Sequence, residues 1–247
     1  MTHLLIGIDD TDNLESRGTG YRARQLGQLI QDTGLGRIIS ISRHQLFFDR
    51  RIPYTSHNSS ACLFVVSDRK TELIALSRDF LLREAAVGSD AGLAVQYYDK
   101  VNDQVVLWGN RAKKEVLSLD EAKTLAADSG IYLEGLTGTH DGIIGSLAAL
   151  GLRKGGNDGR CVWVNGKEIR EIKGIYEVSG LFAISGIDGL TAIDGGEVLL
   201  SDRIDTGGWI RPAVKNHRHI VFVEKSKNTT DYEWTIASKE YIKHATD

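Results

Sequence analysis

The chain has 247 residues, 41% of them hydrophobic and 26% charged, with a formal net charge of −3 at pH 7. This composition is typical of a globular protein and excludes a disordered or fibrous chain. The charge argues against a generally basic nucleic-acid-binding module, although it leaves room for a local basic patch. The two cysteines, Cys62 and Cys161, stand far apart and form no CxxC pair, which excludes a zinc ribbon.

The hydropathy of the chain bears on its location. The N-terminal segment lacks the basic start and long apolar core of a signal peptide. No window approaches the roughly 20 apolar residues of a membrane span. We therefore expect a cytoplasmic protein without a membrane partner.

The first hundred residues contain six predicted elements. Short apolar runs predict strands at residues 3–8, 37–42, 60–66 and 93–98. Apolar residues at helical spacing predict helices at 19–32 and 69–86. The resulting order, β-α-β-β-α-β, is that of a ferredoxin-like unit.

Two kinds of pattern follow in the rest of the chain. We expect a possible strand at 104–108, a helix at 120–127, a strand at 131–134 and a short helix at 142–150. Further on, glycines separate short strands expected at 160–164, 197–200, 219–224 and 232–236. The sequence thus predicts an α+β fold with a first region over residues 1–152 and a β-rich C-terminal region over 153–247.

Three aspartates, Asp9, Asp10 and Asp12, follow the first predicted strand directly. Ligands often bind where the strands of an open α/β sheet end. Crowded carboxylates repel one another, by roughly 1 kcal/mol per close pair in water, unless a cation or hydrogen-bond donors lie between them. Mg²⁺ suits such a group because carboxylates, water and phosphate oxygens share its coordination. The alternative is a solvated acidic turn in which Asp12 or Asn13 caps the next helix.

Two glycine-containing loops lead into predicted helices, where backbone N–H groups could contact a phosphate. The candidate nucleotide-binding residues of these loops are Gly18, Thr19 and Gly20 in the first and Gly138, Thr139 and Gly142 in the second. The second loop lacks the Lys-Ser/Thr ending of a Walker A loop. The alternatives are a flexible strand–helix turn and a tight helix–sheet contact.

A polar loop between the second and third predicted strands is flanked by basic residues. Asn58 is a candidate for binding a base, a ribose or a phosphate. Arg43, Arg50 and Arg51 form a candidate cation cluster for phosphate. An ordinary surface loop would have the same composition, so both interpretations stay open.

Three segments together resemble the archaeal tRNA-isoleucine 2-agmatinylcytidine synthetase family. They are residues 8–13 with Gly18, residues 53–55 with Asn58, and residues 142–151, in the order and rough spacing of that family. The resemblance covers roughly residues 4–152. It implies a ferredoxin-like unit with a kinase-like α/β extension, and an enzyme that uses ATP and Mg²⁺ on a tRNA.

The same resemblance implies that Asp9, Asp10 and Asp12 lie near Mg-ATP. The sequence departs from the family directly after them, where the family reads Gly-Met-Cys-Thr-Thr. Here Tyr21 and Arg22 stand at the place of the threonine that matters to the family's kinase step. Thr19 could substitute only if the loop shifts. The family's zinc ribbon is excluded, and no OB-fold is recognisable in residues 157–247.

The sequence therefore favours a Mg²⁺-dependent, ATP-binding phosphotransferase or ligase-like enzyme. Asp9, Asp10 and Asp12 would be its catalytic and metal-binding residues, and its partners would be a nucleotide and tRNA or another RNA. One alternative is a haloacid-dehalogenase-like phosphatase. The sequence Asp10-Thr11-Asp12 imitates the nucleophile–acid pair of such an enzyme, although that fold also needs a parallel sheet. The other is a non-catalytic nucleotide-binding or RNA-associated module.

Overall fold

The computed structural model describes residues 2–52, 58–227 and 231–246, so residues 53–55 of the resemblance lie outside the described residues. The first elements are β1 (His3–Asp9), α1 (Thr19–Asp32), β2 (Arg37–Gln45), β3 (Ser59–Val66), α2 (Lys70–Glu84) and β4 (Gly92–Tyr97). The four strands lie in the order β4-β1-β3-β2, and each neighbouring pair is antiparallel. This order confirms the ferredoxin-like unit expected from the sequence.

An α/β extension follows this unit. It consists of η1 (Tyr98–Lys100), α3 (Asp103–Ala112), α4 (Leu119–Asp128), β5 (Tyr132–Gly135) and α5 (Gly142–Gly155). The strand predicted at 104–108 is wrong, because these residues belong to α3. The side chain of Asn102 accepts a hydrogen bond from the N–H of Val105 at 3.1 Å and caps this helix. Val105, Trp108 and Ala112 are then buried at helical spacing.

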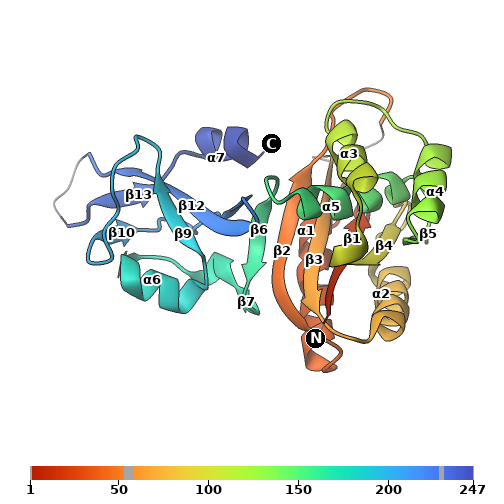
Figure 1. Ribbon diagram of the computed structural model, residues 1–247, viewed down its shortest axis with the longest axis horizontal. Coiled ribbons are helices and arrows are strands. Elements are labelled where there is room, and N and C mark those ends of the chain that lie inside the picture. Colours follow the sequence, from red (N-terminus) through yellow and green to blue (C-terminus); the bar gives the residue numbers. More distant parts are fainter. Residues whose placement is uncertain (1, 53–57, 228–230, 247) are drawn as a thin grey trace.

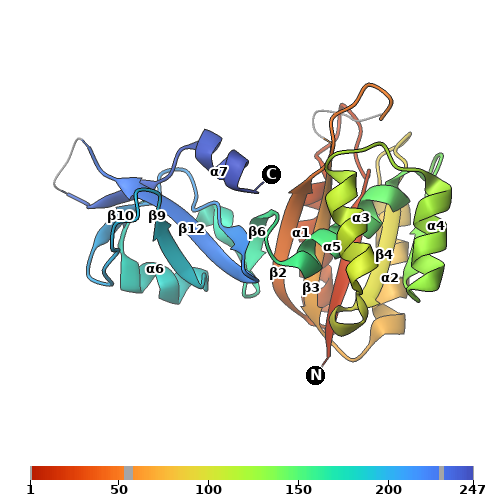
Figure 2. The same ribbon diagram turned by 45° about the horizontal axis from the view of Figure 1, so that its top comes forward.

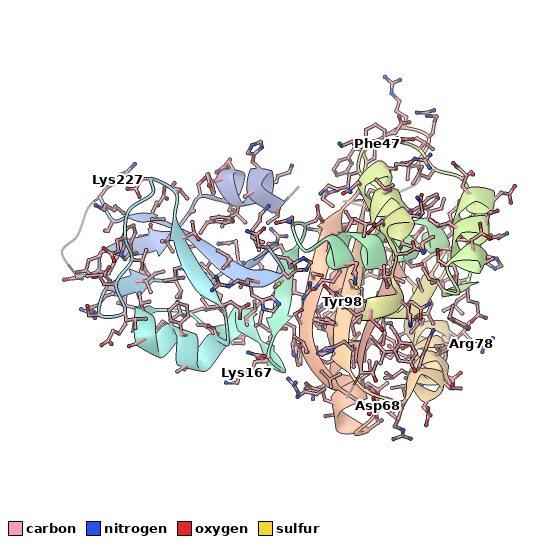
Figure 3. The ribbon with its side chains drawn as sticks, in the orientation of Figure 1. Phe47, Asp68, Arg78, Tyr98, Lys167 and Lys227 are labelled. Atoms are coloured by element: carbon pink, nitrogen blue, oxygen red, sulfur yellow. The ribbon has the colours of Figure 1, made fainter. Side chains whose placement is uncertain are left out.

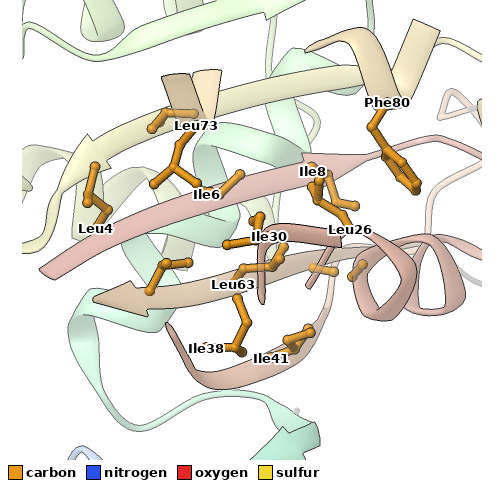
Figure 4. Close-up of a cluster of buried hydrophobic side chains, with 14 of the residues drawn as sticks. Leu4, Ile6, Ile8, Leu26, Ile30, Ile38, Ile41, Leu63, Leu73 and Phe80 are labelled. Atoms are coloured by element: carbon orange, nitrogen blue, oxygen red, sulfur yellow. The ribbon is translucent and has the colours of Figure 1, made fainter. Parts of the chain in front are cut away.

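The sheet of the ferredoxin-like unit lies between two layers of helices. Leu4, Ile6 and Ile8 of β1 pack with residues of α1 and α2 on one face (Figure 4). Leu5 packs on the other face with α3, α4 and α5, which Figure 2 shows together. Strand residues alternate between faces, so β1 is apolar throughout because both of its faces are covered.

Helix α5 comes so close to its neighbours that side chains would not fit between them. A methyl group at Gly7 of β1 would overlap the carbonyl of Ser146 in α5. One at Gly151 of α5 would overlap the carbonyl of Val105 in α3, and one at Gly92 of β4 would overlap the backbone of Gly142. Glycine permits this approach, which brings the start of α5 to the end of β1.

The C-terminal region continues the same sheet. β6 (Arg160–Val164) pairs antiparallel with β2, and the order continues through β11, β12, β13 and β10 to β8. Its other elements are β7 (Lys167–Glu168), η2 (Ile169–Glu171), β8 (Ile175–Glu177), α6 (Val178–Ser185), β9 (Gly189–Ala192), β10 (Arg203–Asp205), β11 (Ala213–Lys215), β12 (Arg218–Lys225), β13 (Trp234–Ile236) and α7 (Lys239–Thr246). Figure 1 shows this region as a second lobe joined to the first through β6.

The β-rich character expected of this region is confirmed, but its details differ from the prediction. Residues 197–200 form no strand, and the N–H of Leu199 donates to the Asp202 carboxylate at 2.9 Å instead. Leu199 and Leu200 are half exposed or more, so this apolar pair marks no buried strand. The division after residue 152 stays a prediction. Of the described helices, none has the length and apolarity that crossing a bilayer would take.

Candidate functional site

The candidate site lies where β1 ends. Asp9 pairs with Gly92 at the start of β4, and Ile8 pairs with Ala61 near the start of β3. Because both neighbours of β1 are antiparallel to it, the site combines the carboxyl end of β1 with the amino ends of β3 and β4. The sequence argument relied on the strand ends of an open α/β sheet, but this sheet is antiparallel, so a ligand site at this place stays a prediction.

A cavity of about 160 Å³, here called the acidic cavity, opens at this place. The predicted site residues that line it are Asp9, Asp10, Asp12, Thr19, Arg51, Asn58 and Gly142. Its opposite wall consists of Leu46, Ala112 and residues 115–117, next to the loop of Phe47 above α3 (Figure 3). The N–H of Phe47 donates to the carbonyl of Ala112 at 3.0 Å and ties this loop to α3.

The aspartates in this cavity repel one another and are poorly hydrated. Burial raises the pKa of Asp9 well above its usual value, and the neighbouring Asp10 raises it further. Burial, followed by the charges of Asp90, Asp12 and Asp141, raises the pKa of Asp10 to about 6. Holding these groups ionised together costs free energy that a cation or added hydrogen-bond donors would offset.

Asp12 has a different environment. Its Oδ1 accepts hydrogen bonds from the N–H and the hydroxyl of Thr19, both at 3.0 Å. Thr19 is 4% exposed, and its Oγ1 also accepts from the hydroxyl of Thr11 at 3.2 Å. Asp12 thus accepts from the first N–H of α1, although the N-cap position itself is Gly18, which makes no side-chain cap hydrogen bond. The same bonds place the Thr19 hydroxyl in the wall of the acidic cavity.

Two features of the backbone shape the same site. Asp10 has φ 50° and His140 has φ 73°, in the left-handed region that residues other than glycine rarely adopt. Such conformations concentrate at functional sites, where the surrounding structure holds them. A methyl group at Gly145, in the first turn of α5, would overlap the carboxylate of Asp9. The absence of a side chain there lets the carboxylate of Asp9 pack against the first turn of α5.

The other predicted site residues lie around the acidic cavity. Gly138 and Thr139 are exposed, and the N–H of Thr139 donates to the carboxylate of Asp90. Asn58 donates from Nδ2 to the carbonyl of Phe47 at 2.7 Å, so part of its amide holds the loop.

The three arginines of the predicted cluster are separated. Arg51 lines the acidic cavity and pairs with Asp49 at 2.8 Å, and the side chains of both Arg50 and Arg51 are exposed. Arg43 lines an adjoining pocket, together with Gly18 and Gly20.

Asp90 and Glu115 are acidic residues of the site that sequence reasoning missed. Asp90 precedes β4, and its charge acts on Asp10. The ferredoxin-like order would have found it, because that order places the start of β4 beside the end of β1. Glu115 follows α3. The sequence predicted a strand at residues 104–108 in place of this helix, and that prediction does not place Glu115 near the site.

The residues present can be tested against the expected Mg²⁺. Among the described residues, no group of three or more His, Cys, Asp and Glu side chains is placed to hold a metal ion. Mg²⁺ requires only one or two carboxylates when water and phosphate oxygens complete its octahedron. Asp9 and Asp10, buried and mutually repelling, therefore fit Mg²⁺ that arrives with a nucleotide better than a resident metal.

Comparison with known proteins was made by sequence and by structure. No family model matches the chain. Over 152 residues it is 31% identical to MJ0921, an uncharacterized protein of Methanocaldococcus jannaschii, in a match covering 62% of this chain. The match covers 50% of MJ0921, so the chain spans about half the length of this relative.

Solved structures share the fold. A tRNA fluorescent labeling enzyme is 25% identical with a TM-score of 0.54, covering 60% of this chain and 36% of its own. Apo TiaS, a tRNA agmatidine synthetase, is 24% identical with a TM-score of 0.53, covering 60% and 35%. The complex of TiaS with tRNA and ATP is 24% identical with a TM-score of 0.55, covering 61% and 36%. About 60% of this chain thus has the fold of TiaS, which confirms the resemblance, although it spans only about a third of those chains.

Proposed function

We propose that the protein is an ATP-using enzyme that transfers a phosphoryl or nucleotidyl group to an RNA, with Mg²⁺ held at Asp9 and Asp10. The observation that carries this is the buried carboxyl of Asp9 and the half-buried carboxyl of Asp10, both with a raised pKa, in one cavity with Thr19 and the first turn of α5. The similarity to structures of TiaS with tRNA and ATP supports a nucleotide and an RNA as partners.

Each wall of the acidic cavity has a part in this proposal. Asp9 and Asp10 would hold Mg²⁺, which when bound would offset the negative charge of the nucleotide phosphates. Gly142 and Gly145 of α5 line the cavity, but the N–H groups of Gly142, Ile143 and Ile144 already donate to backbone carbonyls, so the phosphate contacts are assigned to Mg²⁺ and Arg51. Asp12 orients the Thr19 hydroxyl toward the same space, and Arg51 would offset charge on the phosphates.

A non-catalytic nucleotide-binding module is the second candidate. It is favoured by Tyr21 and Arg22, which stand where the resemblance places a threonine. Both are engaged elsewhere: Arg22 pairs with Glu84 at 3.3 Å, and the Tyr21 ring lies 4.6 Å from the Arg17 guanidinium. The phosphatase alternative finds no support in the fold, because β1 is antiparallel to both neighbours rather than part of a parallel sheet.

Thermal unfolding with ATP, with Mg²⁺ and with both tests the nucleotide site. We expect joint stabilisation of the wild type, about 2.7 kcal/mol at a hundredfold excess over Kd, and its loss in Asp10→Asn. Asparagine tolerates the left-handed backbone of Asp10, so the variant should fold.

Asp79→Asn, at an exposed position of α2, is the matched control and should respond as the wild type does. Equal stabilisation of all three proteins would place the nucleotide elsewhere. ATP consumption in the presence of an RNA pool then separates the enzyme from the non-catalytic module.

A further inference from the structure

A second pocket adjoins the acidic cavity and has the opposite charge. It measures about 410 Å³ and is lined by Arg17, Arg24, Arg43, Arg160 and Arg170, and we call it the arginine pocket. It shares Asp12, Thr19 and Ser59 with the acidic cavity. Arg160 and Arg170 come from β6 and η2, so the pocket forms only because β6 pairs with β2.

Two aromatic rings and a hydroxyl hold these arginines in place. The guanidiniums of Arg17 and Arg24 lie 4.6 and 5.6 Å from the centre of the Tyr21 ring. Those of Arg160 and Arg170 lie 5.6 and 5.3 Å from the centre of the Trp209 ring. Nε of Arg43 donates to the hydroxyl of Ser59 at 2.8 Å. Cation–π contacts of this kind orient guanidiniums before a ligand arrives.

The positive charge of the pocket is only partly compensated. Arg24 pairs with Glu168 at 2.7 Å. Within the described ranges, Arg17 and Arg170 have no carboxylate at ion-pair distance. Burial lowers the pKa of Arg24, the charge of Glu168 raises it, and the charges of Arg170 and Arg17 lower it. In a chain of net charge −3, this concentration of positive charge favours an anionic ligand.

We propose that the arginine pocket binds the phosphodiester backbone of an RNA strand while a nucleotide occupies the acidic cavity. The guanidiniums of Arg17 and Arg170 suit two phosphates, which a strand presents in succession. The common wall at Thr19 and Ser59 would place such a strand beside the nucleotide phosphates. The inference rests on the proposed function, because the RNA is its acceptor, but it assigns the binding to residues outside the acidic cavity.

Fluorescence anisotropy of a labelled, short single-stranded oligoribonucleotide tests the proposal, with and without a saturating non-hydrolysable ATP analogue and Mg²⁺. We expect Arg17→Ala and Arg170→Ala each to weaken binding roughly tenfold. Each should also reduce the slope of log K against log salt by about 0.7, because one phosphate is no longer neutralised. Arg211→Ala is the matched control, since its guanidinium lies 5.2 Å from the Trp209 ring but does not line the pocket. Melting curves confirm that each variant is folded.

Two results would overturn the inference. One is RNA binding that Arg17→Ala and Arg170→Ala weaken no more than Arg211→Ala does. The other is displacement of the RNA by the ATP analogue, which would assign the arginine pocket to the nucleotide's own phosphates. Measuring RNA binding and nucleotide binding separately distinguishes this inference from the proposed function. Arginine-dependent RNA binding without any nucleotide binding by the wild type would support the RNA site and refute the nucleotide site.

Discussion

Asp10 combines two unfavourable features in one residue. Its backbone is left-handed, and its carboxyl is buried among the charges of Asp90, Asp12 and Asp141. Each feature alone would favour another residue at this position, because left-handed backbone suits glycine and buried carboxyls suit a neutral side chain. Their coincidence beside the start of α5 agrees with the ligand-binding role proposed for Asp10.

Ser42, His44 and Asp158 form a network that resembles a hydrolase triad but cannot act as one. Nε2 of His44 is 2.8 Å from the Ser42 hydroxyl, and Nδ1 is 2.8 Å from the Asp158 carboxylate. Ser42 and His44 are fully buried in β2, so no substrate reaches them. Asp158 is also paired with Lys113 of the α3 C-terminus. The network therefore connects β2, α3 and the segment before β6.

Acid should destabilise the protein through His44. Burial lowers its pKa below 6.5, and the charges of Lys113 and Arg153 oppose the effect of Asp158. Because the unfolded chain takes up this proton first as the pH falls, the contribution of His44 to stability is complete above about pH 6.5 and declines below it. Protonation of His44 alone should lower the melting temperature from pH 7 to pH 5, whereas the raised pKa values of Asp9 and Asp10 act in the opposite direction. His44→Gln should flatten this fall, whereas His3→Gln, at an exposed position, should not; equal slopes in all three would refute the assignment.

Among the elements, those fixed by their own periodicity were predicted best. Helix α1 has the predicted bounds, because Gly18, Gly34 and the apolar spacing between them mark both ends. The prediction of a strand at residues 104–108 was wrong because a run of Val105, Val106 and Leu107 is as typical of a strand as of a helix. The Asn102 cap and the contact with α5 decide in favour of the helix. The arginine pocket depends on the pairing of β6 with β2, which no local pattern contains, whereas Asp90 could have been placed from the predicted ferredoxin-like order.

The contact of α3 with α5 should be intolerant of even one methyl group. Gly151→Ala would overlap the carbonyl of Val105, which is backbone and cannot rotate away. We expect a loss of about 3 kcal/mol in the free energy of unfolding, measured by urea denaturation. Gly180→Ala in α6 meets open space and should be neutral or slightly stabilising, because alanine favours helices. Similar losses in both variants would contradict the close packing of α3 against α5.

At the scale of the whole molecule, β6 covers the edge of β2 and joins the two lobes. Val162 and Trp163 of β6 also belong to the hydrophobic cluster under α1 and α2. A chain ending at residue 152 would expose that edge and lack this packing. We expect it to melt at a lower temperature than the full chain and to self-associate, as measured by sedimentation velocity. A monomer with the melting temperature of the full chain would instead support an independent domain over residues 1–152.

The first turn of α1 is the partition between two compartments of opposite charge, with Thr19 in the wall of both. Because Thr19 lines both pockets, any shift of this turn toward one pocket moves it away from the other. If a ligand on one side shifts this turn, it changes the affinity of the second ligand, and thermodynamic linkage makes the effect equal in both directions. The turn is thus where communication between the two halves of the chain would be measured, as the difference in each ligand's affinity with and without the other.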